Sequence, residues 1–134
     1  MRPTNFILAS VLGLLFATPL AAAESAPAAA AKAPQCFFIR NFENWKAADA
    51  KTMYIRVNLH QYYRLDLAAT CPALLSPGSH LITTWQGSSS VCTALDWDLK
   101  VSRGFPGSAE PCIVKTMTPL TSEEVAAIPK KFKP

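Results

Sequence analysis

The chain has 134 residues, of which 13 are Lys or Arg and 9 are Asp or Glu, so its formal net charge is +4. That length predicts one domain with a modest core. A weakly basic chain with a basic tail could associate with anionic lipid, a cell-wall polymer or nucleic acid, but we favour a solvated tail that keeps the protein soluble, and we expect no nucleic acid partner.

The N-terminal segment has the pattern of a secretory signal peptide. Arg2 supplies a positive charge, an apolar run covers residues 6–20, and Ala21-Ala22-Ala23 forms a small-residue cleavage site before Glu24. We therefore expect residues 1–23 to be removed. A membrane anchor is the alternative, but the run is shorter than the roughly 20 apolar residues that span a bilayer. The mature protein is predicted to have no transmembrane segment and to be periplasmic or secreted.

The mature chain is expected to have three parts. Residues 24–34, "ESAPAAAAKAP", contain no large apolar side chain, so we interpret them as a disordered tether. A single β-rich domain is predicted over residues 35–128. Residues 129–134 include the lysines of "KKFKP", and we interpret them as a solvated basic tail.

Short stretches rich in aromatic and β-branched residues predict about six strands and little helix. The strands are expected at residues 36–42, 53–59, 63–67, 80–85, 94–101 and 112–120. Polar or turn-rich segments separate them, at residues 43–51, 71–79, 86–90 and 102–111. Trp45 is expected to fill the core, and residues 71–79 to contain a helical turn. Thr121 and Glu124 have the capping-box spacing of a short C-terminal helix, which Pro129 would end.

The stretch "MYIRVNLHQYYRLDL", residues 53–67, predicts a hairpin with one apolar face. The side chains expected on that face are Met53, Ile55, Val57 and Leu59 on the first strand and Tyr63, Leu65 and Leu67 on the second. A loop over 59–61 would place Arg56 opposite Arg64, whereas a loop over 60–62 places Arg56 opposite Asp66. Because opposite charges stabilise a cross-strand pair, we expect the loop at 60–62.

This pattern of strands predicts a mainly β fold. The expected architecture is a small antiparallel barrel or a strongly curved sheet, with a short C-terminal helix and two disulfides. A barrel is favoured because it leaves no strand edge exposed. An α+β sheet with one covering helix is the alternative.

Four cysteines, Cys36, Cys71, Cys92 and Cys112, lie in the predicted mature chain. In a small exported domain, four cysteines are typical of two disulfides. None of them has the close spacing of a metal site or of a Cys-x-x-Cys redox pair, so we expect no metal and no redox role. Of the three possible pairings we favour Cys36–Cys112 with Cys71–Cys92, because the first would join the opening strand to the last.

Several of these segments together resemble a known family. They are "CFFIRNFENW", "YYRLDLAATCPAL", "VC" with "LDWDLKV", and "PCIVKTMTPLTSEE". The chain resembles small exported bacterial proteins that are classed only as a domain of unknown function, over roughly residues 36–125. The resemblance implies a location in the cell envelope and structural cysteines. It implies no reaction, no cofactor and no catalytic residue.

Asp96 and Asp98 are the strongest candidates for chemistry. In a strand over residues 94–101 they would share a face with Lys100, while Leu95, Trp97, Leu99 and Val101 would point inward. Paired carboxylates can bind a metal or transfer protons, but such a pair is more often the wet face of a strand. His60 and His80 have no motif around them. We therefore assign no catalytic residue and no metal ligand.

The polar face of the hairpin is the best candidate binding surface. Tyr54, Arg56, Tyr62 and Arg64 would combine aromatic rings with guanidinium groups, which suits an anionic polymer, a sugar or a protein partner. The alternative is an ordinary solvent face in which Arg56 pairs with Asp66.

The first functional hypothesis is thus a non-catalytic binding module of the bacterial cell envelope, whose partner is an envelope protein or an anionic surface polymer. An inhibitor of a secreted hydrolase, which would use the loop at 102–111, is the second. A small hydrolase or nuclease that uses Asp96, Asp98 or a histidine is the third. The sequence leaves the oligomeric state open.

Overall fold

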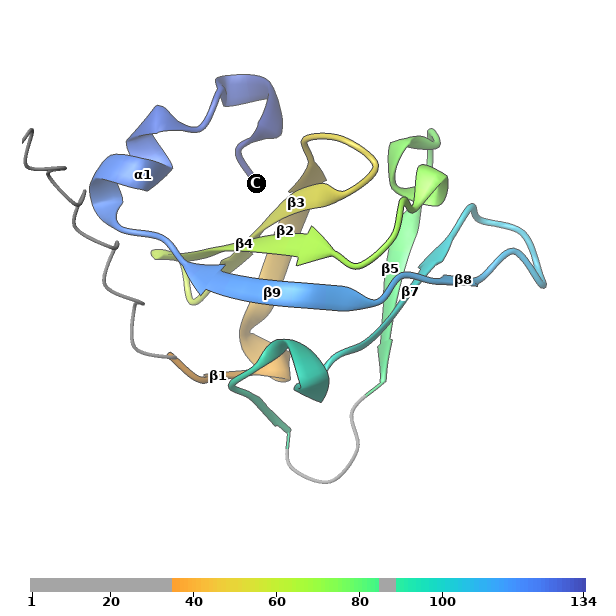
Figure 1. Cartoon of the computed structure of the whole chain (residues 1–134), viewed down its shortest axis with the longest axis horizontal. Coiled ribbons are helices and arrows are strands. Elements are labelled where there is room, and N and C mark those ends of the chain that lie inside the picture. The colour runs from red at the N-terminus through yellow and green to blue at the C-terminus, as the bar shows by residue number, and fades with distance from the viewer. Residues whose placement is uncertain (1–34, 85–88) are drawn as a thin grey trace, which may run out of the picture. The chain divides into compact units, whose positions relative to one another are not determined.

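The computed structural model describes residues 35–84 and 89–134 of the chain. These residues form nine short strands in three antiparallel sheets, together with one α-helix (Figure 1). The predicted mainly β class is therefore confirmed. The strands pair as separate ladders of two, four and three, so the described residues form no closed barrel. The predicted leader at 1–23, the tether at 24–34 and most of the loop at 86–90 lie outside the described residues.

The largest sheet has the strand order β2-β3-β4-β9. Its strands are β2 (Phe42–Ala47), β3 (Thr52–Val57), β4 (Gln61–Leu67) and β9 (Val114–Pro119). Side chains alternate between the two faces of β3 and β4, as the sequence predicts. The face toward the core carries Met53, Ile55, Val57, Tyr63, Leu65 and Leu67, all buried. The polar residues between them consequently lie on the opposite face.

The β3–β4 hairpin has the predicted faces except at Leu59, which was expected in the core but lies in the turn and is 68 % exposed, and the predicted loop is wrong. Val57 pairs with Gln61, so the turn occupies residues 58–60, and Arg56 lies opposite Tyr62 rather than Asp66. Asn58 and Leu59 both adopt positive φ, at 49° and 62°, which allows this earlier reversal. The Leu59 N–H donates to a carboxylate oxygen of Glu43 at 2.8 Å, which holds the turn. The two registers differ by an even number of residues, so the faces are unchanged.

The opening part of the domain also departs from the prediction. The expected strand at 36–42 is interrupted: β1 covers only Phe37–Phe38, a 3-10 turn follows at Ile39–Asn41, and β2 then extends into the segment predicted as a loop. β2 pairs with β3 along its length, with an irregularity between Phe42 and Asn44. It is an edge strand, so its polar side chains remain in water while pairing on the other side stabilises it.

The remaining strands form two smaller ladders. β1 pairs with β6 (Ser90–Val91). β7 (Asp98–Ser102) lies between β5 (His80–Thr84) and β8 (Glu110–Pro111). The strand expected at 80–85 is thus confirmed over its described residues.

The predicted strand at 94–101 is confirmed only in its second half. Residues Ala94–Asp96 form a 3-10 turn, and Leu95, expected in the core, is 93 % exposed. Asp96 forms a capping box with Thr93, and this local bonding competes with the strand. The other side chains expected in the core are buried: Trp97, Leu99 and Val101.

The predicted helical segments are confirmed. A 3-10 turn covers Pro72–Leu75, and α1 covers Ser122–Ala127. Thr121 and Glu124 form the predicted capping box: the Glu124 carboxylate accepts from the Thr121 N–H at 2.7 Å, and the Thr121 hydroxyl accepts from the Glu124 N–H at 3.3 Å. A further 3-10 turn lies at Lys130–Phe132.

Two disulfides are present, but the favoured pairing is wrong. The bonds join Cys36 to Cys92 and Cys71 to Cys112. β1 does not pair with the last strand, as that preference assumed; its partner is β6, and the Cys36–Cys92 bond lies next to the pairs Phe37–Val91 and Phe38–Ser90. Cys71 and Cys112 are 2 % and 3 % exposed, so their bond belongs to the core.

Aromatic rings fill the centre of the core. The Phe37 ring lies 5.1 Å from that of Tyr63 and 5.9 Å from that of Trp97. Trp45 is half-buried and packs against the same cluster, in line with its expected role. The core therefore occupies the face of the β3–β4 hairpin opposite to Tyr54, Arg56, Tyr62 and Arg64.

Candidate binding face

The four predicted binding residues lie side by side on the solvent face of β3 and β4. Tyr54 lies directly opposite Arg64, and Arg56 directly opposite Tyr62, so each ring faces a guanidinium group across the strands. Tyr54, Arg56 and Tyr62 are partly exposed, and Arg64 is exposed. We call these four residues the Tyr–Arg face.

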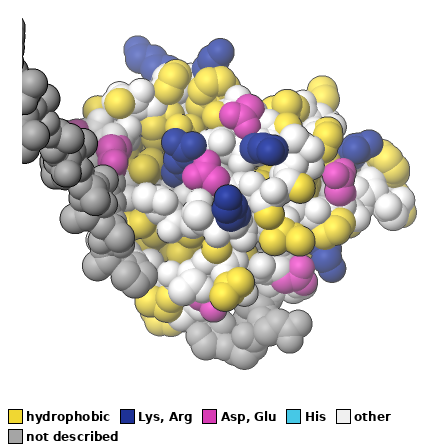
Figure 2. All heavy atoms as spheres, viewed as in Figure 1, with side chains coloured by type: hydrophobic (Ala, Val, Ile, Leu, Met, Phe, Trp, Pro, Cys, Tyr) yellow, Lys and Arg dark blue, Asp and Glu magenta, His cyan; other side chains and the backbone are white. Residues whose placement is uncertain are grey.

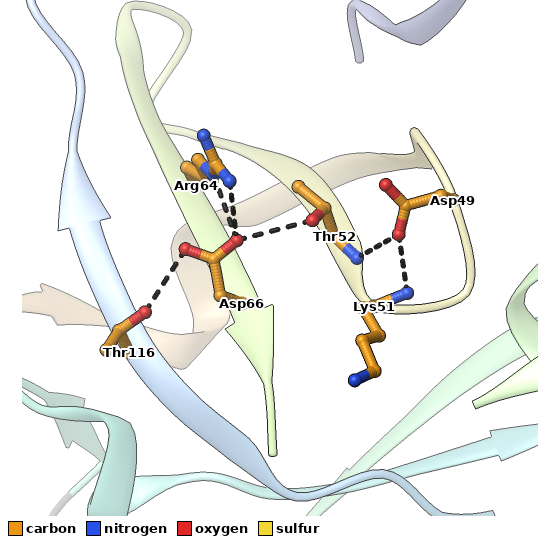
Figure 3. A network of polar contacts seen from close by, with 6 residues as sticks. All are labelled: Asp49, Lys51, Thr52, Arg64, Asp66 and Thr116. Atoms are coloured by element: carbon orange, nitrogen blue, oxygen red, sulfur yellow. Dashed lines mark hydrogen bonds and ion pairs between the residues drawn. The ribbon is translucent and has the colours of Figure 1, made fainter. Parts of the chain in front are cut away.

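Asp66 fixes the position of Arg64 (Figure 3). One Asp66 oxygen accepts from Arg64 Nε at 2.9 Å and from the Thr52 hydroxyl at 3.3 Å, and it forms an ion pair with Arg64 Nη2 at 2.9 Å. The other accepts from the Thr116 hydroxyl at 3.2 Å. The hydrogen bond to Asp66 raises the pKa of Arg64 above its ordinary value. Residues from β3, β4 and β9 thus hold one exposed guanidinium in place.

The turn before β3 supports the same network (Figure 3). An Asp49 oxygen accepts from the N–H groups of Lys51 and Thr52, at 2.6 Å and 2.9 Å. An Asp side chain that bonds the backbone two and three residues later is typical of a tight turn. It sets the start of β3, and with it the position of Thr52 beside Asp66.

Arg56 is held in a similar way by a different carboxylate. Its Nε donates to Glu43 at 2.9 Å, and the second Glu43 oxygen accepts from the Leu59 N–H at 2.8 Å. The expected pair of Arg56 with Asp66 is therefore wrong, because the observed register brings Glu43 of β2 to Arg56. Both arginines thus donate Nε to a carboxylate of the sheet itself.

Two open hollows lie between the Tyr–Arg face and α1. The first, the Tyr54 hollow, has a volume of about 500 Å³. It is lined by Tyr54, Arg64, Asp66, Thr118, Leu120, Glu124, Ala127, Ile128 and Pro129. The second, the Tyr62 hollow, has a volume of about 450 Å³. It is lined by Leu59, His60, Tyr62, Leu120, Ser122, Val125, Ala126 and Lys133. Leu120 belongs to both hollows.

The C-terminal residues contribute to this surface. Lys133 Nζ lies 5.9 Å from the centre of the Tyr62 ring, at the outer range of a cation–π contact. Phe132 is partly buried, and the centre of its ring lies 4.5 Å from Lys131 Nζ. Part of the segment interpreted as a solvated tail, residues 129–134, is thus packed next to the Tyr–Arg face.

Charges of both signs are mixed on this side of the domain. Figure 2 shows cationic and acidic side chains interspersed with apolar ones, without a large patch of one sign. Around the Tyr–Arg face and the two hollows, the cations include Lys46, which lies opposite Tyr54, and Arg56, Arg64 and Lys133. The carboxylates include Asp49, whose charge acts on Arg64, and Glu43, Asp66 and Glu124. The formal charges of this set balance.

A family model described as a family of unknown function, DUF6491, matches residues 1–132. The chain belongs to this family. The predicted resemblance to a domain of unknown function is thereby confirmed. The match also includes the N-terminal residues that precede the described domain. No curated protein and no solved structure is similar enough to this DUF6491 chain to be matched to it.

The residues proposed for chemistry in this DUF6491 protein are dispersed or already bonded. Asp96 caps a 3-10 turn, Asp98 accepts from the Thr84 hydroxyl and lies 3.8 Å from Lys100 Nζ, and His80 begins β5. His60 lies in the hairpin turn and lines the Tyr62 hollow. Among the described residues no three His, Cys, Asp or Glu side chains form a group suited to a metal.

The Asp96 carboxylate should make stability depend on pH. It accepts from the N–H groups of Cys92 and Thr93, at 2.8 Å and 2.7 Å, and these bonds lower its pKa. A depressed folded-state pKa gives stability that is present above the unfolded value of about 4 and lost as the pH falls through the folded value. Wild type should exceed Asp96→Asn in free energy of unfolding at pH 7, and the difference should shrink toward pH 2. Denaturant titrations across this range measure it; a constant difference would contradict the assignment.

The loop proposed for hydrolase inhibition, residues 102–111, carries an exposed Phe105. The Phe105 carbonyl accepts from the N–H and hydroxyl of Ser108, at 3.2 Å and 2.6 Å. Gly107 has φ of 77° and completes the turn. To occupy the oxyanion hole of a hydrolase, the Phe105 carbonyl would have to exchange these internal bonds for the donors of the enzyme. This bonding does not favour an inhibitor that imitates a substrate.

Sequence reasoning identified the four residues of the Tyr–Arg face but missed the groups around them. The sequence predicts a loop at Glu43, and it does not connect Leu120, Glu124 and Lys133 with the hairpin. The alternation of β3 and β4 is a local signal that was available. The pairing of β4 with β9, which carries α1 to this surface, joins residues about fifty positions apart and leaves no local signal.

Proposed function

We propose that this protein is an exported, non-catalytic binding module of the bacterial cell envelope, and that the Tyr–Arg face is its binding surface. The observation that carries the proposal is the placement of Tyr54, Arg56, Tyr62 and Arg64 as two adjacent cross-strand pairs on an exposed sheet face. Aromatic and guanidinium groups are the side chains most enriched at binding surfaces.

Export is supported by the disulfides and by the N-terminal sequence. The two disulfides fit an extracellular or periplasmic protein, because such bonds persist in oxidising compartments. In the described residues no helix has the length and hydropathy needed to cross a membrane. Residues 1–23 have the order of segments typical of a signal peptide.

Binding is supported by the way in which both arginines are held. An exposed arginine loses conformational entropy when it binds a ligand, and this loss weakens binding. Asp66 and Glu43 already restrict Arg64 and Arg56, and hydroxyl or backbone groups anchor the two carboxylates in turn. Surface ion pairs of this kind contribute only about 0–1 kcal/mol to folding. The restricted conformations of the two guanidinium groups therefore contribute more to recognition than to the free energy of unfolding.

The proposal predicts that the protein adheres to envelope material through this face. Wild-type protein should co-sediment with envelope fragments isolated from cells that produce it. The double variant Arg56→Ala/Arg64→Ala should bind at least roughly tenfold more weakly, because each hydrogen bond from a charged donor contributes about 1.5–3 kcal/mol. The bound fraction at increasing protein concentration measures the affinity.

A matched variant separates the face from total charge. Arg40→Ala/Arg103→Ala also removes two arginines, one beside the Phe38 ring and one paired with Glu110, and neither lies on β3 or β4. This variant should bind as wild type does. If both double variants bind equally well, or lose binding equally, the Tyr–Arg face is not the binding surface. Unfolding midpoints of all three proteins verify that the fold is retained.

A further inference from the structure

The Tyr–Arg face combines features that suit one class of ligand. Tyr54 and Tyr62 lie on neighbouring strands, each opposite an arginine, so the two rings are diagonal neighbours on one surface. Such neighbours are about 7–8 Å apart along a sheet, which is within reach of one elongated ligand. Each ring also lines one of the two hollows beside α1. A chain molecule that crosses the face can therefore contact both rings.

The balance of charge argues against a polyanion. Arg64 and Arg56 each lie 2.9 Å from a carboxylate, and Glu124 lines the same hollow as Arg64. An anionic chain on this face would therefore also meet the carboxylates of Glu43, Asp66 and Glu124. Electrostatic complementarity, which guides the recognition of charged partners, is absent here.

The polar groups instead match a ligand that both donates and accepts hydrogen bonds. The terminal nitrogens of Arg56 are donors, the carboxylates of Asp66 and Glu124 are acceptors, and the hydroxyls of Tyr54 and Thr118 can be either. A sugar hydroxyl has the same double capacity, and the C–H face of a sugar ring is apolar. Aromatic surface with a few fixed polar groups is the usual composition of a small-molecule site.

We propose that the Tyr–Arg face binds a neutral glycan chain, with Tyr54 and Tyr62 as stacking surfaces and Arg64, Asp66 and Thr118 as hydrogen-bonding partners. This inference rests on the proposed function and specifies its ligand. A ligand on an open surface of this kind buries little of its own surface, so we expect a modest affinity. It is also insensitive to salt, because no net charge is neutralised.

The test titrates the protein with chitotetraose and maltotetraose, as two neutral probes, and with polygalacturonate, as an anionic one. Backbone NMR shifts should move on β3, β4 and α1 with at least one neutral probe at concentrations up to about 10 mM. The affinity should change less than about twofold between roughly 50 and 500 mM salt, since screening acts on charged ligands. No shift with either neutral probe, or binding of polygalacturonate alone, overturns the inference.

Two variants locate the site. Tyr54→Ala should reduce the affinity for the neutral probe at least about tenfold, as expected for an aromatic side chain central to a contact surface. Phe105→Ala, which removes another exposed aromatic ring in the β7–β8 loop, should bind as wild type does. Unchanged binding by Tyr54→Ala overturns the inference.

The result can be separated from that of the proposed function. If envelope co-sedimentation depends on Arg56 and Arg64 but no neutral probe binds, the glycan is wrong and the binding module stands. If neither the envelope material nor any probe is bound through this face, both proposals fail.

Discussion

A variant with Cys71→Ala and Cys112→Ala is expected to lose more than about 4 kcal/mol of its free energy of unfolding. The bond joins residues 41 positions apart, and the chain-entropy model assigns about 4 kcal/mol to a loop of that length. Both cysteines are buried beside the aromatic core, so their removal also costs packing. The total free energy of unfolding of a domain of this size is about 5–15 kcal/mol. The variant should therefore be close to unfolding at 37 °C.

The second disulfide provides the control. Cys36 and Cys92 are 56 positions apart, so chain entropy alone would make this disulfide slightly more stabilising than Cys71–Cys112. Cys36, however, is exposed, and Cys92 is only partly buried. If packing contributes, Cys36→Ala/Cys92→Ala should be the less destabilised variant although its loop is longer. Urea unfolding, followed by tryptophan fluorescence, ranks the two variants. The opposite ranking would contradict a role for Cys71–Cys112 in the core.

The disulfide pairing shows what sequence patterns leave undetermined. The presence of two disulfides, and their structural role, could be predicted from the spacing of the cysteines and from the predicted compartment. The pairing depends on which strands are neighbours in space, and β1 meets β6 rather than β9. Nothing in the residues around Cys36 distinguishes these partners, because a two-residue strand carries too few side chains to specify one. The pairing of β1 with β6 is determined by the packing of the whole core, not by the residues next to Cys36.

The hairpin shows the reverse case. Alternation over residues 53–67 predicted which side chains are buried, because the period of a strand is a property of the backbone itself. The turn was misplaced because its prediction depended on one cross-strand charge pair, whereas Asn58 and Leu59 adopt positive φ and Glu43 holds them. The contribution of Glu43 was not predictable, since this residue comes from a strand that the polar sequence did not reveal. The composition of the Tyr–Arg face was thus predictable, and its ion pairs were not.

Replacing Tyr63 by alanine should lower the free energy of unfolding by about 3–5 kcal/mol, as for other large aromatic side chains removed from cores. Tyr63 is completely buried and lies 5.1 Å from the Phe37 ring. It connects the large sheet to the β1–β6 ladder, so its loss leaves a cavity between two separately paired sheets. Thermal or denaturant unfolding measures the effect. A loss below about 2 kcal/mol would mean that the surrounding rings collapse into the cavity.

A second variant at the same position separates the ring from the hydroxyl. The Tyr63 hydroxyl donates to the Gln35 carbonyl at 3.2 Å, and Tyr63→Phe removes this bond while keeping the ring. The expected loss is only about 1 kcal/mol, the usual net value of one hydrogen bond. Tyr54 provides the comparison across the hairpin's two faces, because Tyr54→Ala removes a ring of the same kind from the solvent side. That variant should retain most of its stability and lose binding, whereas Tyr63→Ala should lose stability. Tyr63 would then contribute to the core on one face of the hairpin, and Tyr54 to ligand binding on the other.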